Sequence, residues 1–360
     1  MRKKVMALIL SAVLGAAMLA GCGSSAQKSA QTGNTSAKSA VASSALASAK
    51  SAAKSSDKEK TKMNVAVLKG PTGIGAAKLI DESKNNESKN SYDFTIAASP
   101  DEITGKLVSG ELDAAAVPTN LAAVLYNKTQ GKVQIAAINT LGVLYLLDDG
   151  STSIQSVADL EGKTIAISGQ GSVPEYALEY ILKANGVKAN LEFMQEHAQV
   201  AQALAGGKVS IAVLPEPQVT AVEMKNDKIV TALDLTKEWE AACKKNGDDS
   251  DSRLAMGCVV ARKDFIDKNK DAFNTFLAEY QDSISYTENA SDVSKLVEKY
   301  AIMDSAKAAE KAIPNCNIVY YDGKDMKTMI TNFYKVLYDA NPASVGGKLP
   351  GDDFYYINEQ

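Results

Sequence analysis

Residues 110–120 read GELDAAAVPTN, and residues 207–217 read GKVSIAVLPEP. In each stretch a glycine that can end a helix is followed by a short apolar strand. A proline then turns the chain into a new helix. The two stretches therefore predict the same local structure at two places in the chain.

A glycine-rich turn precedes each of these stretches. Residues 69–75 read KGPTGIG and residues 168–174 read SGQGSVP, and each follows a short apolar run and opens a helical pattern. From the first glycine of the turn to the first proline of the later stretch is 48 positions in the first copy and 46 in the second. Matching turns at matching spacings predict two similar lobes.

Strand-like runs alternate with helical patterns through the rest of the chain. The expected strands are residues 65–68, 94–97, 114–117, 133–138, 164–167, 191–194, 211–214 and 317–321. The expected helices are residues 76–83, 119–128, 174–185, 200–204, 216–225, 271–286, 291–300, 305–312 and 326–340, with a further helix that starts after Ser99 as N-cap. Strands separated by helices indicate an α/β fold with parallel sheets and right-handed crossovers.

The chain has to pass between the two predicted lobes. We place one crossing at residues 140–145 and the return at residues 254–260. The first lobe then comprises residues 63–142 and 258–360, and the second comprises residues 143–257. Two antiparallel crossing strands would form a hinge that closes the lobes on each other.

The N-terminus carries a targeting pattern. Basic residues 2–4 are followed by an apolar run and by Leu-Ala-Gly-Cys at residues 19–22. This resembles a bacterial lipoprotein signal, in which residues 1–21 are removed and Cys22 carries lipid; an ordinary secretory signal with a chance cysteine is the alternative. Residues 22–62 are rich in Ser, Ala and Lys and lack an apolar stripe, so we predict a disordered tether. The expected location is the extracytoplasmic face of the cell membrane.

Composition limits the function classes. The chain has 360 residues, 39 Lys and Arg against 43 Asp and Glu, and a net charge of −4. Only three residues are arginine and no basic stripe is visible, which argues against nucleic-acid binding. No long apolar run follows Cys22, so no transmembrane helix is expected in the mature chain.

The cysteines and the single histidine show no recognisable metal or redox spacing. Cys258 lies in an apolar run and is expected to be buried, and a disulfide between Cys243 and Cys316 is left open. His197 has polar neighbours, which predict a loop or a helix start and favour an exposed structural role outside the functional turns. We therefore predict no metal, no cofactor and no catalytic residue.

The four turns point to a binding site. In parallel α/β sheets ligands bind beyond the carboxyl ends of the strands, which is where all four turns lie. Each turn also opens a helix, whose first N–H groups are unpaired and carry partial positive charge. Two facing lobes would gather four such helix ends around one cleft, which suits a small anion or the anionic end of a larger molecule.

These features resemble the solute-binding lipoproteins of ABC importers, in the nitrate, sulfonate, taurine and thiamine-precursor group. The resemblance rests on the signal through Cys22, on ADLEGKTI at residues 158–165, on the turn at residues 169–174 and on LPEP at residues 214–217, and it covers residues 63–360. It implies a type 2 periplasmic-binding-protein fold. It also implies a monomeric receptor that hands a small molecule to a permease and its ATPase.

The resemblance carries ligand contacts over by position. The candidates are Lys69, Thr72, Gly73, Thr119, Asn120, Tyr145, Gly171, Ser172 and Glu216. Tyr145 is expected either to stack on a planar ligand or to pack in the core. Glu216 is expected either to pair with an amino group of the ligand or to cap the helix that it opens.

The chemistry of these turns leaves several ligands open. None of them contains an arginine, which argues against a simple sulfonate or nitrate. An anionic, zwitterionic or heteroaromatic molecule stays possible. Two other function classes are weighed against the receptor: an enzyme on the same fold, as in menaquinone synthesis, and a sensor or adhesion lipoprotein. No activated serine or cysteine is visible, so we do not expect an enzyme.

Overall fold

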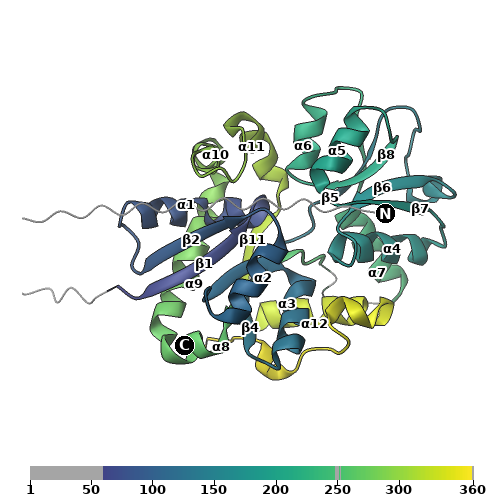
Figure 1. Ribbon diagram of the computed structural model, residues 1–360. Coiled ribbons are helices and arrows are strands. Elements are labelled where there is room, and N and C mark those ends of the chain that lie inside the picture. Colours follow the sequence, from purple (N-terminus) through teal and green to yellow (C-terminus); the bar gives the residue numbers. More distant parts are fainter. Residues whose placement is uncertain (1–59, 248–250, 252, 359–360) are drawn as a thin grey trace, which may run out of the picture. The chain divides into compact units, whose positions relative to one another are not determined.

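The computed structural model describes residues 60–247, 251 and 253–358 (Figure 1). These residues belong to one compact unit. The signal sequence, Cys22 and nearly all of the predicted tether lie outside the described residues. Among the described residues, no helix is long and apolar enough to cross a membrane.

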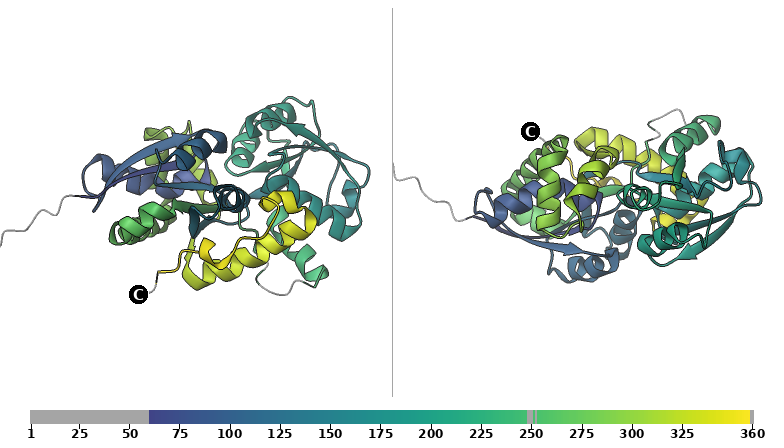
Figure 2. Two further views of the ribbon diagram at one scale, coloured as in Figure 1. Left: turned by 60° about the horizontal axis from the view of Figure 1, so that its bottom comes forward. Right: turned by 90° about the horizontal axis from the view of Figure 1, so that it is seen from above.

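Two separate sheets organise the described chain, and Figure 2 shows the elements of the second sheet, in teal, beside those of the first. The first sheet has the order β11-β4-β10-β3-β1-β2 and the second has the order β7-β6-β8-β5-β9. The strands are β1 (Lys62–Leu68), β2 (Ser91–Ala97), β3 (Ala114–Pro118), β4 (Val133–Thr140), β5 (Leu144–Asp148), β6 (Thr164–Ser168), β7 (Asn190–Met194), β8 (Ile211–Pro215), β9 (Val230–Asp234), β10 (Gly257–Arg262) and β11 (Ile318–Asp322). This confirms a mixed α/β fold with two lobes, one built on each sheet.

Helices fill most of the connections between the strands. They are α1 (Pro71–Lys84), α2 (Pro100–Ser109), α3 (Thr119–Thr129), α4 (Val173–Asn185), α5 (His197–Ala205), α6 (Gln218–Glu223), α7 (Leu235–Lys245), α8 (Lys263–Lys268), α9 (Lys270–Ser285), α10 (Ala290–Lys299), α11 (Ala306–Ala312) and α12 (Gly323–Ala340), with short 3-10 turns η3 (Ile313–Asn315) and η4 (Pro342–Val345). The predicted start of α2 is confirmed, because Ser99 and Glu102 form a capping box.

The sheets are not wholly parallel, and this corrects the prediction. β1 pairs in parallel with β2 and β3, and β6 pairs in parallel with β7 and β8. The strand that enters each sheet from the other lobe, β10 or β5, is antiparallel to its neighbours. The reason is geometric: Gly257 pairs with Pro118 and Leu144 pairs with Pro215, so each entering strand starts where a parallel strand ends.

Two helix predictions were wrong at their boundaries. The first glycine-rich turn was expected to last to residue 75, but α1 already begins at Pro71. Gly73 makes this possible, because a Cβ there would lie 2.5 Å from the carbonyl oxygen of Leu68. The helix expected at residues 216–225 spans only α6, and α7 was not predicted although Asp234 caps its first turn.

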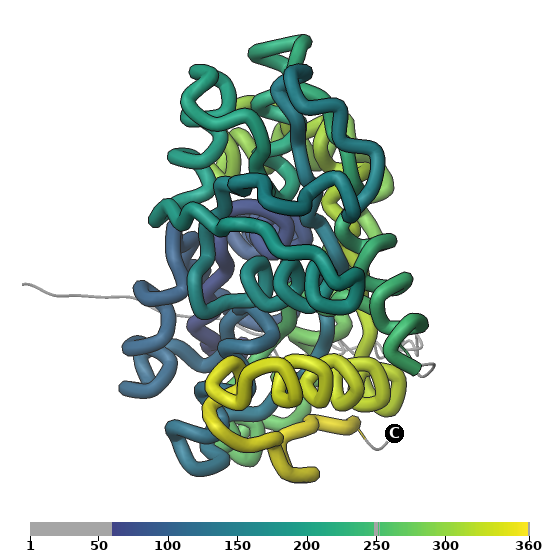
Figure 3. The backbone as a smooth tube through the Cα atoms, turned by 90° about the vertical axis from the view of Figure 1, so that its right-hand side faces the viewer, coloured from purple at the N-terminus to yellow at the C-terminus, as the bar shows by residue number. Residues whose placement is uncertain are grey.

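Helix α12 contacts elements of both lobes. It packs on β4 and β11 of the first sheet and on α4 of the second lobe, as Figures 1 and 3 show. Its Phe333 ring lies 5.7 Å from the ring of Trp239 on α7, which in turn lies 4.8 Å from the ring of Tyr180 on α4. Burial of these aromatic surfaces ties the C-terminal helix to the second lobe.

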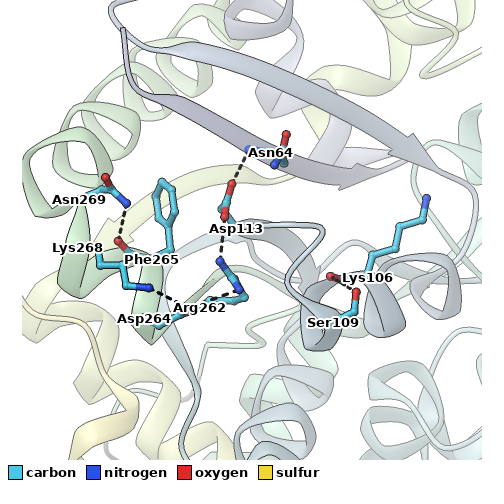
Figure 4. Close-up of polar contacts among 9 residues, drawn as sticks. All are labelled: Asn64, Lys106, Ser109, Asp113, Arg262, Asp264, Phe265, Lys268 and Asn269. Carbon is cyan, nitrogen blue, oxygen red and sulfur yellow. Dashed lines mark hydrogen bonds and ion pairs between the residues drawn. The ribbon is translucent and has the colours of Figure 1, made fainter. Parts of the chain in front are cut away.

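A polar network closes the end of β3 that lies away from Pro118 (Figure 4). Asp113 accepts the backbone N–H of Asn64 at 2.8 Å and forms an ion pair with the Arg262 guanidinium at 3.1 Å. Gly110 ends α2 in the left-handed conformation beside this guanidinium. A Cβ at Gly110 would lie 2.5 Å from Nη1 of Arg262, so the position favours glycine for space as well as for conformation.

We predict that Gly110→Ala destabilises the protein more than Gly186→Ala. Both glycines are left-handed C-caps, at φ 88° and 68°, so alanine costs about 1 kcal/mol of backbone strain at each. Only Gly110→Ala also requires the Arg262 guanidinium to move, and its Nη2 is paired with Asp113, whereas the space beside Gly186 is open. The additional loss should be about 1 kcal/mol or more, measured by urea unfolding with the single tryptophan, Trp239, as the probe. Equal losses in the two variants would contradict this account of the network.

Candidate functional site

The carboxyl ends of β1, β3, β6 and β8 carry the four turns singled out in the sequence. The crossing strands β10 and β5 start beside the ends of β3 and β8, so these ends lie where the chain passes between the lobes. We call the ends of these four strands, with the turns that follow them, the facing edges. They are the place where the predicted site would be assembled.

The facing edges of the two lobes meet in a crossed arrangement. Asn120, in the second turn of the first lobe, donates from Nδ2 to the carbonyl oxygen of Gly171, in the first turn of the second lobe, at 3.3 Å. Gly70, in the first turn of the first lobe, faces Pro217, in the second turn of the second lobe. A Cβ on Gly70 would lie 3.9 Å from Cδ of Pro217. The structure thus brings the two predicted half-sites together.

At the first turn, the side chains serve the turn itself. The Thr72 hydroxyl donates to the carbonyl oxygen of Leu68 at 3.1 Å and accepts the N–H of Leu68 at 3.2 Å. Gly73 is buried against the same carbonyl. Lys69 is exposed, and its backbone N–H donates to Ala97. Of these three candidates, only Lys69 has a side chain that is free to approach a ligand.

At the second turn, Thr119 and Asn120 have different roles. The Thr119 hydroxyl is completely buried and donates to the carbonyl oxygen of Ala255 at 2.6 Å, while its own carbonyl accepts the Tyr334 hydroxyl at 2.6 Å. These bonds hold the start of α3 to the returning chain and to α12, so the Thr119 hydroxyl is used within the protein. Asn120 is 4% exposed, and its Oδ1 is buried without a hydrogen-bond partner.

The glycine-rich turn of the second lobe is closed by local bonds. The Ser172 hydroxyl donates to the carbonyl oxygen of Gly169, and the N–H of Gly171 donates to the Glu175 carboxylate. Gly171 is exposed, at φ 73°. Its carbonyl oxygen reaches the first lobe through Asn120, whereas the Ser172 side chain is used within the turn.

Glu216 and Tyr145 meet the first lobe at Asn315, a residue of η3 that the sequence analysis did not identify. Glu216 is 2% exposed and accepts the N–H and the hydroxyl of Thr220 at 3.1 and 2.8 Å, with a further bond from the Asn315 side chain. The Glu216 carboxylate therefore caps α6, one of the two roles expected for it. Burial raises its pKa.

Tyr145 is half-buried, and its hydroxyl donates to the carbonyl oxygen of Asn315 at 3.5 Å. Burial, reinforced by the carboxylates of Asp234 and Glu216, raises the pKa of Tyr145 to about 12, so the phenol stays neutral. The phenol thus joins β5 of the second lobe to the segment before β11 of the first lobe. Its ring also packs against the apolar cluster of the second lobe, which is one of its two expected roles, whereas stacking on a planar ligand is not tested.

The structure corrects the expectation for His197. It was expected to be exposed, at a loop or a helix start outside the turns. It does begin α5, directly beyond the facing end of β7, but it is only partly exposed. Its Nδ1 lies 2.5 Å from the hydroxyl oxygen of Ser168, the last residue of β6. The register of β6 and β7, which pairs Ser168 with Met194, explains this proximity, but it could not be read from the sequence. Burial lowers the pKa of His197 to about 4.

The cysteines settle a point that the sequence left open. Cys243, Cys258 and Cys316 are all buried and none of them forms a disulfide, so no disulfide joins Cys243 to Cys316. The physical reason is that the two residues belong to different apolar clusters. The expected burial of Cys258 is confirmed. Among the described residues, no three His, Cys, Asp or Glu side chains lie close enough to hold a metal ion.

A surface pocket of about 410 Å³ lies elsewhere, between α4, the end of α7 and α12. It is lined by Glu179, Tyr180, Lys183, Ala184, Asn246, Val336, Asp339 and Ala340. The charged members of this set are exposed, and none belongs to the four turns. The pocket is therefore separate from the facing edges.

Comparisons with known proteins agree with this architecture. A family model described as NMT1/THI5 like matches residues 128–292, slightly less than half of the chain. An ABC transporter structure from Parabacteroides distasonis has a TM-score of 0.68 at 24% identity and covers 84% of this chain and 100% of its own. No curated protein matches the chain.

Two further solved structures share the fold. The periplasmic aliphatic sulphonate binding protein from Escherichia coli has a TM-score of 0.64 at 14% identity, over 80% of this chain and 96% of its own. The periplasmic nitrate-binding protein from Synechocystis has a TM-score of 0.53 at 15% identity, over 74% and 75%. The predicted resemblance is thus confirmed for the fold, which is that of two-lobe periplasmic binding proteins.

We predict that His197 titrates far below an ordinary histidine. Its proton resonances are uniquely assignable because the chain has one histidine, and NMR titration should give a pKa of about 4 rather than 6.5. Between these values the unfolded chain binds a proton that the folded chain does not. Stability should therefore fall as the pH drops from 6.5 to 4, by at most about 3 kcal/mol.

The variant His197→Gln is the matched control for this effect. In this variant the free energy of unfolding should no longer contain the fall between pH 6.5 and 4 that His197 causes, while the acid sensitivity caused by other groups persists. Urea unfolding at several pH values measures both. A measured pKa at or above 6.5, or equal slopes for the two proteins, would show that His197 is not enclosed with Ser168 as described.

Proposed function

We propose that this protein is a solute-binding receptor that captures a small molecule between its two lobes and delivers it to an ABC importer. The observation that carries the proposal is the crossed contact of the four turns. Asn120 meets Gly171, and Gly70 meets Pro217, so that every turn predicted to bind a ligand faces a turn of the other lobe. The solved structures that share the fold are named as importer components or as sulfonate- and nitrate-binding proteins, which supports the same role.

The crossings between the lobes are suited to hinge motion. The outward crossing is the short segment of residues 141–143, and the return passes through residues 254–256 beside it, where the N–H of Met256 donates to the carbonyl of Thr140 at 3.0 Å. Gly142 lies so close to the Thr236 side chain that a Cβ would overlap it. Two short crossing segments of this kind can absorb the dihedral changes of lobe closure.

The N-terminal sequence indicates where in the cell the receptor is located. We propose that Cys22 is lipidated and holds the domain at the extracytoplasmic face of the cell membrane, with residues 22–62 as tether. The periplasmic location named for two of the fold relatives supports an extracytoplasmic site. A permease and its ATPase would be the partners, and the receptor would act as a monomer.

An enzyme on this fold is the second candidate, and the Ser168–His197 contact is the observation that favours it. The geometry is unsuitable for a nucleophile, however. Ser168 is 1% exposed, so its hydroxyl is not accessible to a substrate carbonyl or phosphoryl group. The receptor therefore accounts for the facing edges better than an enzyme does.

We predict that a small molecule raises the melting temperature of a chain that begins at Gly23. The test is a thermal-shift screen of sulfonates, nitrate, pyrimidines and aromatic acids, because a ligand that binds only the folded state stabilises it by mass action. Hits should bind reversibly and be recovered unchanged. Conversion of a hit into product would favour the enzyme, and failure of every compound in the screen would count against a receptor for these classes.

We also predict that Tyr145→Ala weakens the binding of a hit by about tenfold or more, measured by calorimetry, because it removes a half-buried ring on β5, next to the facing end of β8. Tyr338→Ala is the matched control: Tyr338 is also partly buried, but it lies on α12. The Tyr338→Ala variant should bind the hit with the affinity of the wild type. Equal effects of the two substitutions would argue against a site at the facing edges.

A further inference from the structure

The outward crossing is hydrogen-bonded to the first lobe at one residue and to the second lobe at the next. The carbonyl oxygen of Gly142 accepts Nδ2 of Asn317 at 3.1 Å, directly before β11 of the first lobe. The carbonyl oxygen of Val143 accepts the N–H of Glu216 at 2.9 Å, directly after β8 of the second lobe. Because peptide groups are planar, only the φ and ψ dihedrals of Val143 lie between these two carbonyl groups.

The chain before Gly142 is fixed to the first lobe as well. The N–H of Leu141 donates to the carbonyl oxygen of Asn317 at 3.1 Å, so Asn317 holds two successive residues of the crossing. Thr140 before them is paired within the first sheet. Residues 140–142 therefore belong to the first lobe, and the second lobe begins at the carbonyl group of Val143.

The return crossing is bonded to the first lobe where it passes this point. The carbonyl oxygens of Ala255 and Met256 accept the hydroxyl and the N–H of Thr119, at 2.6 and 3.2 Å. The N–H of Met256 donates to the carbonyl oxygen of Thr140 at 3.0 Å. Residues 255–256 thus support the end of β4 and leave Val143 as the place where the outward crossing can bend.

Gly142 is in contact with the second lobe at this place. A Cβ on Gly142 would lie 2.1 Å from Oγ1, 2.8 Å from Cγ2 and 2.9 Å from Cβ of Thr236, in the first turn of α7. The backbone of Gly142 is outside the left-handed region, so glycine is required here for space and not for conformation.

Rotation of the Thr236 side chain does not relieve this crowding. Its Cβ is fixed by the backbone of α7, and the N–H of Thr236 donates to the Asp234 carboxylate at 3.0 Å, which caps the helix. Helix α7 in turn packs on α4 and β5 of the second lobe. A side chain at residue 142 therefore has to push α7, and the second lobe with it, away from the crossing.

We infer that Val143 is the pivot of the outward crossing and that the contact of Thr236 with Gly142 is the stop that limits lobe closure. This rests on the proposed function, in which closure captures a solute. Gly142 moves with the first lobe and Thr236 with the second, so the contact is made across the pivot. Glycine at residue 142 lets the lobes approach as far as described, and a larger residue holds them apart.

The test compares Gly142→Ala with Gly105→Ala in chains from Gly23 to Gln360 that carry a nitroxide label on Met224→Cys. The label lies beside α6, which contacts α11 of the first lobe in the described arrangement. Paramagnetic relaxation of the α11 backbone amides reports the closed population of the free protein, because the shortest distances dominate it.

Gly142→Ala should lower the closed population by about five- to 150-fold, the range that corresponds to the usual cost of overpacking. Gly105→Ala should leave it unchanged, because a Cβ on Gly105 would meet no atom within 4 Å. Equal relaxation of α11 in the two variants would overturn the inference. So would a loss of unfolding free energy in Gly142→Ala without a loss of closed population.

Substitutions of Thr236 locate the effect in this contact. Thr236→Ala removes two of the three crowded atoms and should restore part of the closed population to the Gly142→Ala chain. Thr236→Gly removes the third atom and should restore the closed population to the level of Thr236→Gly alone. A closed population that stays equally low in all three chains with Ala at residue 142 would overturn the inference.

The Thr236 variants also decide the question if Gly142→Ala alone does not fold. Added to Thr236→Ala, it meets one crowded atom and should still lower the closed population severalfold; added to Thr236→Gly, it should change nothing. Equal populations with and without Gly142→Ala in the Thr236→Ala chain would overturn the inference. None of these measurements includes a solute, so the thermal-shift screen judges the proposed function separately.

Discussion

The direction in which the chain enters each sheet determines where a site can form. Parallel strands such as β3 and β8 end at the edge where the chain passes to the other lobe, and the entering strands β10 and β5 start beside those ends. This antiparallel entry places the carboxyl edges of both sheets at the crossing. The helix N-termini and turns that follow these strands are consequently gathered at one place, which is the usual ligand position in open α/β sheets.

Most side chains at the facing edges maintain the turns rather than project from them. Thr72, Thr119 and Ser172 each donate to a nearby backbone carbonyl, and Glu216 caps α6. Such bonds fix the backbone of the four turns. Asn120 differs from these residues because its side chain donates to a carbonyl oxygen of the opposite lobe, that of Gly171.

The sequence predicted the elements that have local signals and missed those that depend on tertiary contacts. The capping box at Ser99 and the proline turn at Pro118 depend on a few neighbouring residues only, so the sequence predicted both. The sequence analysis did not predict that β5 and β10 run antiparallel to their neighbours in the sheets, because this depends on which lobe the chain comes from. The contact of His197 with Ser168 and the role of Asn315 arise from strand register and lobe packing, which no local pattern records.

We propose that the lobes close on a small molecule at the facing edges. Val108 on α2 and Met224 beside α6 are exposed positions, one on each lobe. Spin labels on Val108→Cys and Met224→Cys, in a chain that begins at Gly23, report the distance between the lobes by pulsed electron paramagnetic resonance. The described native cysteines are buried, which directs labelling to the two new thiols. A stabilising compound should convert a broad or long distance distribution into a single shorter one. Identical distributions with and without a tightly bound compound would contradict the claim.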